Sequence, residues 1–179
     1  MGYSFRSKIQ PVKTGTVPVL QIKDLSEKSE VTLSSLDRIE LSDFKETHVI
    51  QKNDIIFRSR GFNANSFLVP ATAGPLILAA PLFRIRVTDR SVLPAYINWY
   101  ISQSSAQTYL GSIAEGTTQK MVNKQSLANL PVMLPPSNIQ ATVVEVAKMA
   151  ARENELCQEI ARKRSKLVTT QLLDLIKEK

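Results

Sequence analysis

The chain has 179 residues, a formal net charge of +7, and a single cysteine and a single histidine. This length fits one domain with an appendage, and there is no apolar run long enough to cross a bilayer as a helix. One cysteine and one histidine exclude an internal disulfide and a His/Cys zinc site. We therefore expect a cytoplasmic protein without a metal, a cofactor or a membrane anchor.

Positive charge favours an acidic partner, and nucleic acid is the most common one. The excess is +2 over residues 1–70, +3 over residues 71–137 and +2 over residues 138–179. It is not concentrated in a basic tail. This distribution is typical of a folded surface that faces DNA, although charge alone does not establish one.

Apolar runs bounded by turn residues predict short strands over the first part of the chain. The predicted strands cover residues 17–22, 55–59, 66–69, 75–80 and 82–87. Asp54 closes a turn that leads into the second of them. In the last strand apolar and basic residues alternate, which puts Arg84 and Arg86 on its solvent face.

A helix is predicted over residues 93–107, because Pro94 suits a first turn and apolar residues follow at helical spacing. A polar segment covers residues 115–124, and a short strand over residues 130–134 ends at Pro135 and Pro136. These elements predict a mixed α/β (α+β) domain over residues 1–136.

Residues 137–179 contain no glycine and no proline and predict one long helix. Ser137 is a good N-cap, and Gln140 would complete a capping box. An apolar stripe at alternating four- and three-residue steps is typical of a coiled coil, and it contains Ile139, Val143, Val146, Ala150, Cys157, Ile160, Leu167 and Leu172. About 40 residues give roughly 60 Å of helix. A partner helix is expected to cover this stripe, and the alternative is packing against the chain's own domain.

Catalytic motifs are absent from the sequence. There is no phosphate-binding P-loop and no G-x-G-x-x-G pattern. Residues 134–137 lack both the polar and the aromatic positions of a methyltransferase motif, and no carboxylate-x-Lys pair follows Asp54. Cys157 and His48 fit a helix stripe and a strand edge better than a nucleophilic pair. We therefore do not expect an enzyme.

Four segments in the same order resemble the target-recognition domains of type I restriction-modification specificity subunits. Residues 2–6 resemble the opening of one branch of that family, and residues 17–25 its first strand. Residues 54–61 look like its "gDil-s-rG" strand and loop. Residues 116–140 are similar to its closing pattern of polar loop, strand, Pro-Pro and helix start. The likeness spans nearly the whole chain.

The resemblance implies a module that recognises double-stranded DNA for a larger complex. The implied partners are modification subunits that carry the methyltransferase chemistry, and whether a restriction and translocase subunit joins them stays open. A full specificity subunit has two recognition domains and two helices, whereas this chain has one of each. It is either a fragment or a half-subunit, and the Met1 start favours a half-subunit that forms a homodimer through its helix.

Two polar segments are the candidates for DNA contact, because arginine, lysine and glutamine are the side chains that bind phosphates and base edges. The first is Arg58, Ser59 and Arg60, which lie at a strand end before Gly61. The second is Thr117, Thr118, Gln119 and Lys120. The alternatives are a solvated strand end and a structural loop. A coiled-coil adaptor that binds only protein is the alternative function.

Overall fold

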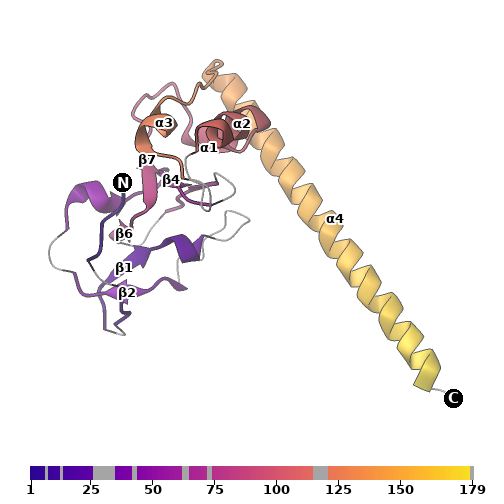
Figure 1. Ribbon diagram of the computed structural model, residues 1–179. Helices are drawn as coiled ribbons and strands as arrows, with labels where there is room; N and C mark the ends of the chain where they lie inside the picture. Colours follow the sequence, from indigo (N-terminus) through magenta and orange to yellow (C-terminus); the bar gives the residue numbers. More distant parts are fainter. Residues whose placement is uncertain are drawn as a thin grey trace. The chain divides into compact units, whose positions relative to one another are not determined.

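The computed structural model describes residues 1–6, 8–12, 14–25, 35–41, 44–61, 65–71, 74–114 and 121–177. The chain divides into two compact units, which we call unit 1 (Met1–Gln140) and unit 2 (Ala141–Lys179) (Figure 1). The strands and short helices belong to unit 1, and unit 2 is the greater part of one long helix. The expected α/β (α+β) domain followed by a long C-terminal helix is confirmed.

The strands of unit 1 form two small sheets. Each of the segments predicted as a strand over residues 17–87 contains one of the observed strands. The strands are β1 (Val17–Leu20), β2 (Arg38–Ile39), β3 (Val49–Ile50), β4 (Ile55–Arg58), β5 (Ser66–Leu68), β6 (Leu76–Leu78) and β7 (Leu82–Ile85). One sheet has the order β2-β1-β6-β3 and the other the order β5-β4-β7. β1 and β6 pair in parallel, and the other pairs are antiparallel.

β4 is the central strand of its sheet and separates two parts of the core. Its residues Ile55, Ile56 and Phe57 are fully buried. Successive side chains of a strand point to opposite faces, and accordingly Ile56 packs in one apolar cluster while Ile55 and Phe57 pack in another. The continuous apolar run of this strand therefore reflects burial on both faces.

The turn before β4 is held by the residue that the sequence indicated. Asp54 is 1 % exposed, and its carboxylate accepts a hydrogen bond of 2.8 Å from the backbone N–H of Gln51. Asn53 adopts a positive φ of 69°, a conformation that asparagine tolerates better than most residues. The prediction of a turn is confirmed.

The helix predicted over residues 93–107 is interrupted and forms α1 (Pro94–Ile101) and α2 (Ser104–Ile113). Gln103 between them has an extended backbone with ψ of 152°. The Ser102 hydroxyl and the Gln103 side-chain amide both donate to the carbonyl of Trp99. Short polar side chains that satisfy the last carbonyls compete with helix continuation, so the prediction of one helix was wrong at this point.

Two further expectations near the start of the long helix are corrected. Residues 131–136 contain no strand. Pro131 has no N–H to donate to a neighbouring strand, and the carbonyl of Met133 instead accepts a hydrogen bond of 2.8 Å from the hydroxyl of Tyr96. α3 (Lys124–Ala128) precedes this segment, and α4 (Ser137–Lys177) follows it. Gln140 makes no capping box, because its side chain accepts from the Leu93 N–H and donates to the carbonyls of Ser91 and Pro135.

Candidate nucleic-acid interface

The loop after β4 begins with Arg58, the last residue of that strand. β4 pairs on one side with β5 and on the other with β7, so its end is held from both sides. The Arg58 Nε donates to the Arg60 carbonyl at 3.0 Å. Gly61 follows with a φ of +127°, which is strained for any residue with a side chain. The loop therefore has a defined shape that places two guanidinium groups at one strand end.

Ser59 supports the backbone of this loop. It is 2 % exposed, and its hydroxyl donates to the carbonyl of Pro81. Its own carbonyl accepts a hydrogen bond of 2.9 Å from the Val122 N–H. These two hydrogen bonds hold the loop in place, and Arg58 and Arg60 are the neighbouring side chains that extend toward solvent. Contact between Ser59 and DNA stays a prediction.

Arg60 pairs with Met121, a residue distant in the sequence. It is exposed and forms an antiparallel bridge with Met121, and its Nε lies 3.4 Å from the Met121 sulfur. Thr117, Thr118, Gln119 and Lys120 lie outside the described residues. Met121, the bridge partner of Arg60, directly follows Lys120 in the sequence. The sequence does not show this proximity.

A groove of about 470 Å³ lies beside the same loop. Its cationic side chains are Arg60 and Lys8, its apolar lining includes Phe5, Ile9, Ile22, Ala79, Ala80 and Pro81, and no acidic residue lines it. Sequence reasoning missed Lys8. The backbone bridge between Tyr3 and Ala79 brings the N-terminal segment to this groove, and no local pattern in residues 1–10 indicates that pairing.

Arg84 of β7 and Arg86, which follows that strand, both have hydrogen-bond partners in the fold. The Arg86 guanidinium contacts both carboxylate oxygens of Asp54 at 2.7 Å, and this hydrogen bonding raises the pKa of Arg86. Arg84 donates to the carbonyl of Val49 at 2.7 Å. Bidentate pairing with a buried carboxylate fixes Arg86 in the fold. Arg86 is exposed and Arg84 is half-buried, so both reach solvent as expected and in addition bind neighbouring parts of the chain.

Most of the stripe predicted for dimerisation is exposed in the single chain. Ile139, Val146, Ile160, Leu167 and Leu172 are exposed apolar residues, and Ala150 and Cys157 are also exposed. Val143 is half-buried. Large apolar side chains in contact with water along several turns of a helix mark an interaction surface.

Among the described residues, no group of three or more His, Cys, Asp or Glu side chains could hold a metal ion. Within the same residues, no helix is apolar enough over a sufficient length to cross a membrane.

Comparison with known proteins agrees with this arrangement. A family model described as "Type I restriction modification DNA specificity domain" matches residues 1–162. The match includes unit 1 and more than half of unit 2. A search of curated proteins found no match.

Proposed function

The chain belongs to the family of type I restriction modification DNA specificity domains, and on that premise we propose that it reads one half of a split DNA target. In this proposal two copies read the two halves, and the pair directs methyltransferase subunits to the site. A restriction and translocase subunit would be directed in the same way where one is present. The observation that carries the proposal is the loop after β4.

Arg58 and Arg60 supply the cationic groups for DNA contact. Neither has an ion pair with an acidic side chain in the described part of the chain. Guanidinium groups bind phosphates, or guanine edges in the major groove, through two parallel hydrogen bonds. Lys8 across the groove adds a point charge suited to a phosphate. The hydrogen bond from the Arg58 Nε to the Arg60 carbonyl orders this guanidinium in advance, which reduces the entropy lost when it binds DNA.

A second copy is the proposed partner for α4. Residues 137–156 carry a net charge of −1 and residues 158–177 a net charge of +3. An antiparallel pair places these oppositely charged halves side by side, whereas a parallel pair places like charges together. Cys157 lies midway between Ser137 and Lys177. In a fully overlapping antiparallel pair, the two copies of Cys157 therefore meet at the twofold axis.

The central test is a map of methylated DNA sites in cells that contain the chain and its modification subunits. We expect a shared split motif with the wild type and its loss with Arg58→Glu/Arg60→Glu. The control, Lys45→Glu/Lys52→Glu, makes the same charge change at two exposed lysines of unit 1 and should keep the motif. Methylation without a shared motif, or an unchanged motif in the arginine variant, would contradict DNA reading and favour the protein-binding adaptor.

Crosslinking at the single cysteine tests the dimer separately. A short bismaleimide should join two wild-type chains through Cys157. The control is Cys157→Ser/Ser165→Cys, which moves the thiol away from the expected axis along the same helix and should crosslink far less. Equal crosslinking of both proteins would contradict the centred antiparallel pair, and a strictly monomeric chain would remove the dimer while leaving DNA reading in place.

A further inference from the structure

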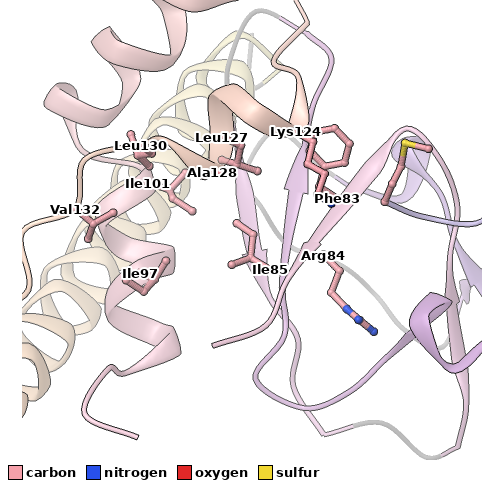
Figure 2. Close-up of a pocket in the computed structure, with 11 residues that line it drawn as sticks. Phe83, Arg84, Ile85, Ile97, Ile101, Lys124, Leu127, Ala128, Leu130 and Val132 are labelled. Atoms are coloured by element: carbon pink, nitrogen blue, oxygen red, sulfur yellow. The ribbon is translucent and has the colours of Figure 1, made fainter. Parts of the chain in front are cut away.

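Unit 1 contains an apolar pocket away from the loop after β4. The pocket has a volume of about 330 Å³ and lies between α1, α3 and β7 (Figure 2). Its principal apolar lining consists of Phe83, Ile85, Ile97, Ile101, Leu127 and Leu130. We call it the α1–α3 pocket. None of residues 58–61 lines it, so it is distinct from the candidate DNA interface.

The pocket is an opening in the apolar core. Phe83 and Ile101 are buried members of one core cluster, whereas Ile85, Ile97 and Leu127 pack against that cluster and are only partly buried. In Figure 2, Ile97 and Val132 approach from one side while Ile85 and Leu127 approach from the other. A concave apolar surface in contact with water is the usual character of a binding site.

The charge at the edge of the pocket is positive. Lys124 and Arg84 line it, and no acidic residue does. The Arg84 guanidinium binds the Val49 carbonyl and points away from the apolar side chains in Figure 2. Lys124 is exposed, and no ion pair holds it in the part of the chain that the structure describes. An occupant with a negative charge beside its apolar group complements this edge.

The apolar surface continues along the chain beyond the pocket. Val132 lines the pocket, and the next two residues, Met133 and Leu134, are 75 % and 54 % exposed. The hydrogen bond from the Tyr96 hydroxyl fixes the backbone of this segment to α1. An apolar pocket that is followed in the chain by two exposed apolar residues fits a protein surface better than a small molecule, because a ligand confined to the cavity would leave those side chains uncovered.

We propose that the α1–α3 pocket docks the modification subunit, through one large aliphatic or aromatic side chain of that subunit next to an acidic residue. The inference rests on the proposed function, which requires that subunit as a partner. It adds the place on unit 1 where the partner binds and the chemistry of the segment that binds there. The contact would let one subunit be recruited while the loop after β4 stays free for DNA.

A pocket-filling substitution tests the proposal without removing core atoms. Ala128 is an exposed residue of α3 that lines the pocket, so the ring of Ala128→Phe would occupy the cavity. Gln125→Phe is the matched control, because Gln125 is exposed on the same helix and does not line the pocket. The affinity of the full chain for purified modification subunit is measured by calorimetry. We expect Kd to rise at least roughly tenfold for the first variant and less than about twofold for the second.

Charge reversal gives a second measurement that does not depend on packing. Lys124→Glu should weaken binding of the modification subunit, whereas Lys52→Glu should not, since Lys52 is an exposed lysine away from the pocket. If Ala128→Phe and Lys124→Glu both bind as the wild type does, the pocket is not the docking site and the inference is overturned. The same follows if Ala128→Phe reduces Cys157 crosslinking instead, because the occupant is then a second copy. If the wild type itself does not bind the subunit, the proposed function fails.

Discussion

Unit 1 buries its apolar side chains against one another, whereas unit 2 leaves most of its own in solvent. The strands and short helices of unit 1 enclose three apolar clusters. In unit 2, every described residue is exposed except Val143, Val144, Ala147 and Glu159. A single helix has no interior, so its apolar face can be covered only by another surface. The comparison teaches that unit 1 encloses its own apolar core, whereas the apolar face of unit 2 is left for another surface to cover.

The largest expected effect is the loss of the proposed α4 dimer, caused by substitutions that leave unit 1 unchanged. Ile160→Asp/Leu167→Asp places charges on the exposed stripe of α4. Each change occurs twice in a symmetric dimer, so we expect a loss of about 4 kcal/mol or more in association, roughly a thousandfold in Kd. Analytical ultracentrifugation measures it. Gln158→Asp, on the same helix outside the stripe, is the control, and equal dimerisation of all three proteins would contradict the pairing.

The second prediction concerns a substitution that should destabilise unit 1 and leave the pairing of unit 2 unchanged. Asp54→Ala leaves Arg86 and the Gln51 N–H without their buried partner. Because Arg86 is partly exposed, we expect unit 1 to lose about 2–3 kcal/mol rather than the full cost of breaking a buried pair. Trp99, the single tryptophan, reports unfolding of unit 1 by fluorescence. Crosslinking through Cys157 should persist in this variant, and its loss would show that the two units are not independent.

A smaller effect is expected at Gly61, whose positive φ gives the loop after β4 its shape. Gly61→Ala must adopt a φ of +127°, which costs about 1 kcal/mol or more. The midpoint of thermal unfolding should fall slightly. The free energy of DNA binding should decrease by more than the free energy of unfolding, because Arg58 and Arg60 shift. Gly111→Ala, in a helix with open space around that position, should not lower either quantity. Unchanged DNA binding in Gly61→Ala would argue against a preorganised loop.

The smallest effect is a pH dependence confined to unit 1, which holds the single histidine. Burial, followed by the nearby charges of Lys45, the amino terminus and Arg84, lowers the pKa of His48. The folded state then binds fewer protons than the unfolded state once the pH falls below the unfolded pKa of about 6.5. Stability is full above that pH and is lost as the solution becomes more acidic. Comparing unfolding midpoints at pH 7.5 and 5.5 should show a smaller drop in His48→Phe than in the wild type.

The strands β1, β4, β5, β6 and β7 were predictable because local patterns specify them, whereas the two-residue strands β2 and β3 were not predicted. Apolar runs between turn residues located β4 and β7, and the turn at Asp54 was read from its neighbours. The interruption between α1 and α2 was missed, because Ser102 and Gln103 fit a helix by spacing and break it through side-chain hydrogen bonds. Propensity is a weak guide wherever a polar side chain can satisfy backbone groups in two ways.

The candidate site was predictable in residue type but not in assembly. Arg58 and Arg60 were identified from a strand end beside a glycine. The burial of Ser59 was not, because it depends on Pro81, which lies in another part of the chain. The ion pair of Arg86 with Asp54 likewise joins residues 32 positions apart. Contacts of this range depend on the folded backbone and leave no local pattern.

The bridge between Arg60 and Met121 has a practical meaning for anyone who wishes to engineer the target of this module. It joins two stretches of chain that are 61 positions apart, so a change in one alters the backbone support of the other. A mutant library that varies residues 58–61 alone would leave the stretch around Met121 unchanged. Libraries that randomise both stretches together, and hold Ser59 and Val122 constant as the shared frame, should yield new recognition variants more often.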